Sequence, residues 1–248
     1  MNAIQRTGAS GRLSACDALR RSPHERARLS ILQAGALLAG VLALVAAAPA
    51  AAESDTGTAL KNTAIAGTVL SYAVAFIKGA PVGGCLLHGS GGPGADWGVR
   101  GQYGEDAELK FGSIGIERRP CDLTRLGGLS LDLSPVLAAG YWKADSGSAF
   151  AQHAFDVAYV PMLYWRAPAG AVRFDLGFGI GPMLLSEPEI GNRRKGTNFQ
   201  FSDQFEAGLS SADGRWRVAF AYRHVSNLDI SSDNDAVDFK GVALSWRP

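Results

Sequence analysis

Strict alternation of side-chain type over residues 171–185 constrains the fold of this chain more than any other feature. Large apolar residues occupy every second position, and Arg173, Asp175 and glycines lie between them. Successive side chains of a β-strand point to opposite faces of the sheet. One face of this segment is therefore apolar, and the other is polar or nearly bare. The apolar positions are Val172, Phe174, Leu176, Phe178 and Ile180.

The same alternation recurs along the chain and predicts eight strands. Most of them have about ten residues or more, which is the length that a tilted strand needs to cross a bilayer. Large aromatic residues on one face, with Gly, Ala or charged residues on the other, are typical of a small outer-membrane barrel. The predicted strands are residues 96–104, 108–118, 128–143, 151–166, 171–185, 197–210, 214–225 and 237–246.

A soluble β-sandwich or lipocalin-like barrel is the alternative to a membrane barrel. It would bury the aromatic face inside, where bulky rings from so many strands would be crowded. We therefore predict an all-β fold, an eight-stranded antiparallel transmembrane β-barrel of the outer-membrane type, over residues 96–248. The predicted barrel makes the membrane its partner. The formal net charge of +1 provides no basic field for nucleic acid, so no nucleic-acid partner is expected.

Residues 1–52 form a separate segment with the features of a leader. Positive charge lies between Arg6 and Arg28, an apolar run begins at Ile31, and small residues precede Glu53. This order is typical of a secretory signal peptide. The apolar run is also long enough for a membrane anchor, which is the alternative. We expect cleavage and export to the outer membrane.

Residues 53–95 are expected to form a periplasmic N-terminal extension of unknown shape. Their apolar stretch, TAIAGTVLSYAVAFI, is too short to cross a bilayer as a helix. Cys85 lies in this extension, and Cys121 lies in a turn that the predicted topology places on the periplasmic side. Two thiols on one side of the membrane, in an oxidising compartment, are able to form a disulfide.

The predicted seventh strand continues its apolar row with two polar residues. His224 and Ser226 share the parity of Trp216, Val218, Phe220 and Tyr222, and Asp238 shares the parity of the apolar row of the eighth strand. Neighbouring antiparallel strands bring such positions within side-chain reach. We expect His224, Ser226 and Asp238 to converge on the outside wall, at the height of the outer leaflet. Asp233 and Asp235 are alternatives to Asp238 if the connecting loop is irregular.

Polar side chains that face hydrocarbon are costly, which suggests a catalytic purpose. Serine becomes nucleophilic when a base takes its proton, and a carboxylate behind a histidine orients the ring and stabilises the imidazolium. Asn227 and Asn234 are candidates for binding the oxyanion or orienting the substrate. The alternative is a polar rim that meets only headgroups and water, with asparagines that stabilise turns.

The motif RHVSN is followed by Asn234 ten residues after the histidine and by an acid at fourteen. This pattern resembles the signature of the lipid A 3-O-deacylase family, the PagL-like outer-membrane enzymes. The segments DLGFGIGPMLLS, GTNFQFSDQFEAGL and GYW also resemble that family, and the resemblance covers roughly residues 96–246. It implies Ser226 as nucleophile, His224 as base, and Asp238 in place of the family's glutamate.

The resemblance also implies hydrolysis of the ester-linked 3-hydroxyacyl chain at position 3 of lipid A. Lipopolysaccharide of the outer leaflet is then the partner, and neither a cofactor nor a metal ion is expected. The alternative function is that of a non-catalytic small outer-membrane barrel with an anchoring or adhesion role.

Overall fold

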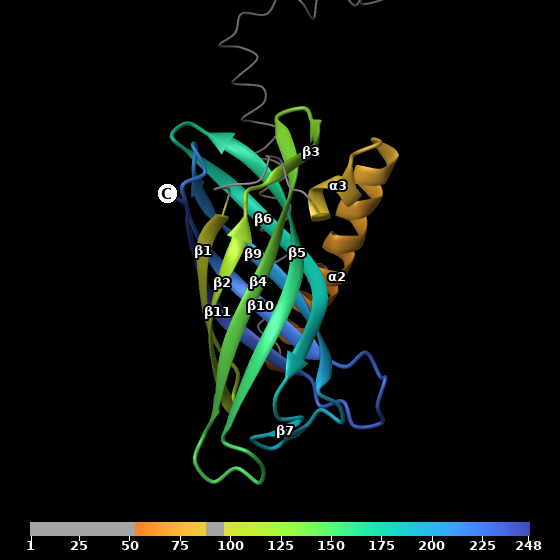
Figure 1. Cartoon of the computed structure of the whole chain (residues 1–248), viewed down its shortest axis with the longest axis vertical. Coiled ribbons are helices and arrows are strands. Elements are labelled where there is room, and N and C mark those ends of the chain that lie inside the picture. Colours follow the sequence, from red (N-terminus) through yellow and green to blue (C-terminus); the bar gives the residue numbers. More distant parts are fainter. Residues whose placement is uncertain (1–52, 88–96) are drawn as a thin grey trace, which may run out of the picture.

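The computed structural model describes residues 53–87 and 97–248, and the predicted signal peptide lies outside this part of the chain. The described residues form a closed antiparallel barrel of eight strands (Figure 1). Pairing of β1 with β11 and of β2 with β4 closes the sheet. The barrel strands are β1 (Trp97–Glu105), β2 (Leu109–Arg118), β4 (Leu129–Ala144), β5 (His153–Ala169), β6 (Val172–Leu185), β9 (Phe199–Ser211), β10 (Trp216–Ser226) and β11 (Val237–Trp246).

Three short strands extend the connections between the barrel strands. β3 (Cys121–Leu126) continues β2 beyond Pro120, which has no N–H to donate, and pairs with the start of β4. β7 (Glu189–Ile190) and β8 (Arg193–Arg194) form a hairpin in the long loop after β6. The predicted eight-stranded barrel is confirmed. The alternation located the strands well because each barrel strand has one face toward the lumen.

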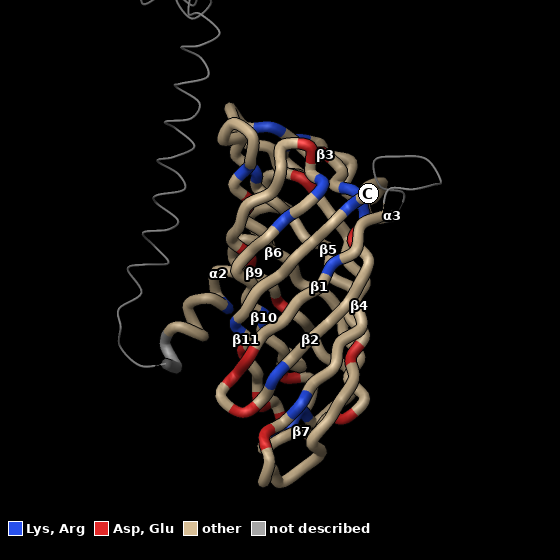
Figure 2. Tube along the Cα trace, turned by 90° about the vertical axis from the view of Figure 1, so that its left-hand side faces the viewer, with Lys and Arg blue, Asp and Glu red and all other residues tan. Residues whose placement is uncertain are grey.

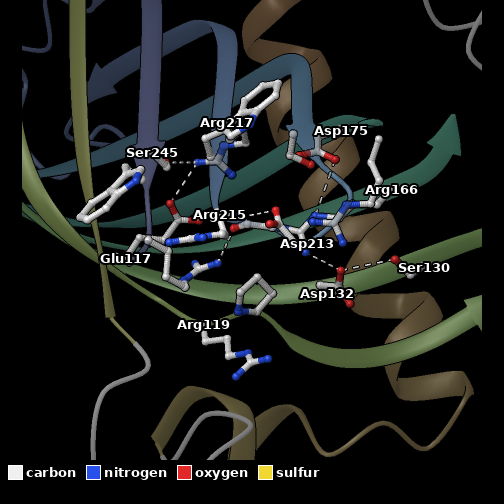
Figure 3. A pocket seen from close by; sticks show the side chains of 18 of the residues that line it. Glu117, Arg119, Ser130, Asp132, Arg166, Asp175, Asp213, Arg215, Arg217 and Ser245 are labelled. Atoms are coloured by element: carbon white, nitrogen blue, oxygen red, sulfur yellow. Dashed lines mark hydrogen bonds and ion pairs between the residues drawn. The ribbon is translucent and has the colours of Figure 1, made fainter. Parts of the chain in front are cut away.

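Buried ion pairs occupy much of the lumen. Arg223 lies 3.1 Å from Asp156, and Arg217 lies 3.2 Å from Glu117. At the end of the lumen near β3, a cavity of about 340 Å³ is lined by such pairs (Figure 3). Apolar side chains face outward instead. A soluble barrel has its apolar side chains inside, so the outward arrangement fits a barrel surrounded by lipid. Exposed outward residues include Ile114, Leu137, Phe155, Val157, Phe174, Leu184, Val218, Phe220, Val242 and Leu244.

An apolar cluster closes the opposite half of the lumen. The ring of Phe239 contacts those of Phe111 and Trp142, with centroid distances of 5.2 and 4.8 Å. Val225 and Val237 belong to the same cluster. These inward residues show which side chains of β10 and β11 point outward, because neighbouring residues on a strand point to opposite faces.

Helix α2 (Glu53–Ile77) lies outside the barrel wall, against β6, β9 and β10 (Figures 1 and 2). Small residues allow close packing: a Cβ added to Gly67 would lie 2.2 Å from the ring of Phe178. The opposite face of α2 is exposed, with Leu70 at 61% and Phe76 at 67%. The stretch Thr56–Ile77 is long and apolar enough to cross a membrane. The helix begins at Glu53, ten residues before the stretch TAIAGTVLSYAVAFI, so it is longer than the apolar stretch that by itself is too short to cross a bilayer.

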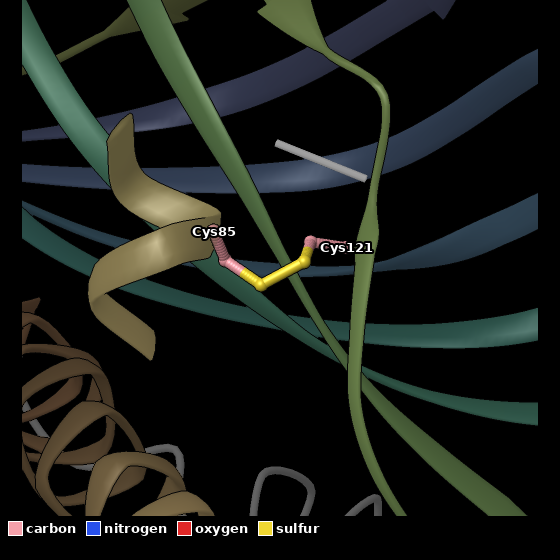
Figure 4. Close-up of a disulfide and its surroundings, with 2 residues drawn as sticks. All are labelled: Cys85 and Cys121. Carbon is pink, nitrogen blue, oxygen red and sulfur yellow. A yellow bond between two sulfur atoms is a disulfide. The ribbon is translucent and has the colours of Figure 1, made fainter. Parts of the chain in front are cut away.

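The end of α2 is fixed to the barrel. Gly79, at φ 67°, follows the helix, and the amide of Ala80 donates to the carbonyl of Ala75 at 2.9 Å, as in a Schellman cap. Helix α3 (Val82–Leu87) then brings Cys85 into a disulfide with Cys121 at the start of β3 (Figure 4). The segment expected as a periplasmic extension therefore runs along the wall, and α3 lies at the β3 end of the barrel.

Candidate active site

Strand β10 presents His224 on the outer wall of the barrel. Arg223 binds Asp156 inside the lumen and Val225 packs in the interior cluster, so His224 between them points outward. The β10–β11 register pairs His224 with Asp238. The imidazole Nδ1 lies 2.7 Å from the Asp238 Oδ1. Because Nδ1 is engaged by this carboxylate, Nε2 is the nitrogen available to exchange a proton with a serine.

A tyrosine holds the carboxylate of Asp238 from a second side. The Tyr222 hydroxyl donates to the same Oδ1 of Asp238 at 2.6 Å, and it lies 3.0 Å from the carbonyl oxygen of Gly57 in α2. Asp238 is only half-buried, with 34% of its side chain exposed. Two hydrogen bonds to one oxygen therefore orient a carboxylate that burial alone would leave mobile.

Ser226 ends β10 on the same face as His224. Side chains two residues apart on a strand project in the same direction. Ser226 and His224 are each 5% exposed, and no hydrogen bond joins them in the described part of the chain. A nucleophile–base hydrogen bond often forms only when a substrate binds, so the shared face of Ser226 and His224 is compatible with proton transfer between them.

The two asparagines hold the loop that follows Ser226. The Nδ2 of Asn227 donates to the carbonyl oxygens of Lys195 and Asp233, both at 2.8 Å. Its backbone amide donates to the Oδ1 of Asn234 at 2.8 Å, and the Nδ2 of Asn234 donates to the Oδ1 of Asp229, also at 2.8 Å. These bonds order the loop, and they occupy the N–H groups that an oxyanion would use.

The alternative acids are engaged elsewhere. Asp235 accepts a hydrogen bond from the backbone amide of Arg194 at 2.9 Å, and the backbone of Asp233 binds Asn227. Both aspartates are exposed in the loop between β10 and β11. Of the three candidate acids, Asp238 in β11 is therefore the one that binds the histidine.

Sequence analysis missed a second acid beside His224. The β9–β10 register pairs Asp203 with His224 on the side opposite Asp238. Asp203 is 1% exposed, and its Oδ1 has no hydrogen-bond partner among the described residues. A signal was present, because Asp203 interrupts the outward aromatic row of Phe199, Phe201 and Phe205, just as His224 interrupts the row of β10.

The Lys195 side chain, close to the loop after Ser226, is fully buried. Its Nζ donates to the carbonyl oxygen of Val225 at 2.9 Å. Burial, followed by the charge of Arg193, lowers the pKa of Lys195 to about 7. Lys195 thus contacts both neighbours of Ser226, Val225 through its amine and Asn227 through its carbonyl oxygen.

The described residues contain no group of three His, Cys, Asp or Glu side chains placed to hold a metal ion. An outward histidine–carboxylate pair with a serine on the same strand is able to perform nucleophilic catalysis.

Fold and site together define a class: an outer-membrane-type β-barrel whose candidate catalytic groups lie on the lipid-facing wall. The family described as Lipid A 3-O-deacylase (PagL) matches residues 122–247, half of the chain. The chain belongs to this family.

Individual relatives agree with the family assignment. A protein named Lipid A deacylase PagL from Bordetella bronchiseptica is 34% identical over 117 residues, which cover 47% of this chain and 63% of that one. A protein of the same name from Pseudomonas aeruginosa is 24% identical over 103 residues, which cover 40% of this chain and 59% of that one. These matches span about three fifths of the relatives' length.

A solved structure supports the fold. The crystal structure of the outer membrane enzyme PagL matches with a TM-score of 0.54 at 18% identity, and it covers 61% of this chain and 99% of that one. An eight-stranded barrel resembling that enzyme is thus established for this chain. The match leaves a substantial part of this chain without a counterpart.

Proposed function

We propose that this protein is an outer-membrane serine esterase that removes the ester-linked 3-hydroxyacyl chain from position 3 of lipid A. The observation that carries the proposal is the 2.7 Å contact between His224 and Asp238 on the outer wall, with Ser226 on the same face of β10. Family membership supports lipid A as the substrate. A site on the outer wall suits a substrate that is itself embedded in the membrane.

In the proposed reaction, the Nε2 of His224 takes the proton of Ser226 as its Oγ attacks the ester carbonyl carbon. The tetrahedral intermediate then collapses, and His224 returns the proton to the departing sugar 3-hydroxyl. The acyl chain is left on Ser226. Water activated by His224 hydrolyses this acyl-enzyme and releases the 3-hydroxy fatty acid, while Asp238 stabilises the imidazolium at both steps.

Asn227 and Asn234 act in this proposal as orienting residues. Their hydrogen bonds support the backbone directly after Ser226. Donation to the oxyanion requires Asn227 to exchange one of its two carbonyl partners for the substrate oxygen. The loop therefore changes its hydrogen bonding when the tetrahedral intermediate forms.

The proposed location is the outer membrane, reached after removal of the signal peptide. The end of the barrel that carries the β7–β8 hairpin then faces outward, and the β3 end with its disulfide faces the periplasm. His224, at the outer end of β10, lies at the height of the outer leaflet, where lipopolysaccharide resides. The proposed chemistry needs no cofactor.

Mass spectrometry of lipid A from cells with and without the protein tests this function. Expression should remove the mass of one 3-hydroxyacyl chain, and the Ser226→Ala variant should leave lipid A intact while still folding as a heat-modifiable barrel. A non-catalytic barrel with an anchoring or adhesion role would leave the lipid A masses unchanged in both strains. It would also leave Ser226 unlabelled by a serine-hydrolase reagent.

A further inference from the structure

The first turns of α2 lie directly on the candidate site. The carbonyl oxygen of Gly57 is 3.0 Å from the Tyr222 hydroxyl. A Cβ added to Gly57 would lie 2.6 Å from the Oδ2 of Asp238. The helix backbone therefore contacts the acid of the proposed trio, and only glycine permits this approach.

The following turns of α2 cover the wall beside the site. Leu60 and Ala64 pack in one cluster with Tyr222, Phe178 and Phe205. Lys61, on the same turn as Leu60, interacts electrostatically with Asp203, the second acid beside His224. The amino-terminal part of α2 thus contacts the surroundings of the histidine from both β9 and β11.

The exposure of the site is too small for a lipid ester. His224 and Ser226 are each 5% exposed. Attack requires a carbonyl carbon at about 3–3.5 Å from the serine oxygen. A multi-chain lipid that carries its ester near the headgroup cannot reach this position while the site stays covered.

The two ends of α2 are held very differently. The carboxyl-terminal end is fixed by the Cys85–Cys121 disulfide and by a 2.9 Å hydrogen bond from the Trp165 Nε1 to Ser71. Ala75 and Val82 add apolar packing there. The amino-terminal end is held by the Tyr222–Gly57 hydrogen bond and by the packing of Leu60 and Ala64, with no covalent tie to the barrel among the described residues. The described part of α2 therefore has a covalently fixed end far from the site and an end on the site that is held by noncovalent contacts alone.

We propose that α2 is a lid that determines which esters reach Ser226. In the closed state its first turns lie against Tyr222 and Asp238 on the membrane side of the site, and a large lipid substrate enters only when this half of the helix lifts away. Small esters need less opening than lipid A does. The identity of the large substrate rests on the proposed function, but the covering of the site by α2 does not.

Thiol labelling measures the lid without any catalysis. In a Ser226→Cys background, Cys85 and Cys121 are disulfide-bonded and the remaining cysteine, Cys16, belongs to the predicted leader, so the introduced thiol is the free one in the processed protein. Adding Gly67→Leu forces the middle of α2 away from Phe178, about 15 Å along the helix from Gly57. We expect maleimide labelling of the barrel in detergent micelles to become severalfold faster.

Two further variants complete the labelling experiment. Leu70→Ala alters the exposed face of α2 and should leave the labelling rate unchanged. The double substitution Cys85→Ser with Cys121→Ser releases the fixed end without touching the barrel wall at the site, and it should also accelerate labelling. Equal labelling rates in the parent, the Gly67→Leu variant and the double-serine variant would overturn the proposal.

Substrate selectivity is the second readout, with Ser226 intact. Gly67→Leu should raise the rate on purified lipopolysaccharide more than the rate on a short p-nitrophenyl ester. An unchanged ratio of the two rates would show that α2 does not select substrates and would overturn the proposal. Faster thiol labelling together with no esterase activity in any variant would instead contradict the proposed function and support the covering of the site by α2.

Discussion

The hydroxyl of Tyr222 and the imidazole of His224 bind the same oxygen of Asp238, at 2.6 and 2.7 Å. This shared oxygen links β10 and β11 on the outer wall. The carboxylate is held in one orientation although a third of its side chain is exposed. Tyr222 is therefore a positioning residue for the histidine, acting through the acid.

Replacing Tyr222 by Phe should lower kcat on a short ester by roughly tenfold, since a hydrogen bond to a charged group contributes about 1.5–3 kcal/mol. The ring remains to fill its place beside Phe205 and Leu60, so the barrel should keep its stability. Tyr159→Phe on the outer wall of β5 is the matched control. Equal kcat values for the two variants would show that Tyr222 does not position the histidine.

Asp238→Ala should reduce activity by about 100-fold or more, because the histidine loses the group that orients it and stabilises its charge. Asp233→Ala and Asp235→Ala should stay close to the parent rate, since both residues are exposed and bind loop backbone. Rates of fatty acid release from lipopolysaccharide give the comparison. A larger loss of activity in either loop variant than in Asp238→Ala would show that the loop aspartate, and not Asp238, orients the histidine.

A substitution in the lumen tests the assignment of charged side chains to the inside of the barrel and apolar side chains to the outside. Glu206 interacts with both Arg100 and Arg217, all of them buried. Glu206→Ala should lower the free energy of unfolding by about 3–5 kcal/mol, because it leaves buried cations without their partner. Urea unfolding in detergent micelles measures the change, with Val218→Ala on the lipid face as control. A smaller effect for Glu206→Ala than for Val218→Ala would contradict the assigned facing.

Lys195 predicts a pH dependence of stability. Its pKa in the folded protein is lowered from 10.5 to about 7. Between these pH values the unfolded chain holds a proton that the folded chain has released, so this residue makes the free energy of unfolding rise with pH. Below about pH 7 the cost of burying the charged amine is present in full.

The Lys195→Met variant isolates this contribution. Its stability relative to the parent should be highest below pH 7 and should decline toward pH 10, with a slope of at most about 1.4 kcal/mol per pH unit. Unfolding in urea across this pH range gives the difference. A difference that stays constant with pH would show that Lys195 does not titrate in the folded protein.

The barrel was readable from the sequence because its strands expose one face to lipid and one to the lumen. The residues from Val172 to Ile180 show this period without interruption. The predicted strand, 171–185, therefore agrees closely with the observed bounds of β6, Val172–Leu185. The positions of His224 and Asp238 follow from the same period, since parity fixes the face and register brings neighbouring strands together. Pairing with Asp238 rather than Asp233 depends on the loop conformation, which local sequence does not determine.

Features that depend on packing between distant parts of the chain could not be predicted from the sequence. The placement of α2 is set by two glycines that meet Asp238 and Phe178, residues more than a hundred positions away in the chain. The burial of Lys195 is set by the loops around the end of β10. Asp203 was readable in principle, because parity alone puts it in the outward row of β9.

The central claim is that Ser226 and His224 act as one catalytic unit on the outer wall. The most direct measurement is the release of 3-hydroxy fatty acid from purified lipopolysaccharide by the Ser226→Ala, His224→Ala and doubly substituted proteins, each checked for barrel folding by heat modifiability. Residues that act as a unit have non-additive effects. We expect all three variants to lose activity to the same residual level. Near-parental activity in folded Ser226→Ala would contradict the account.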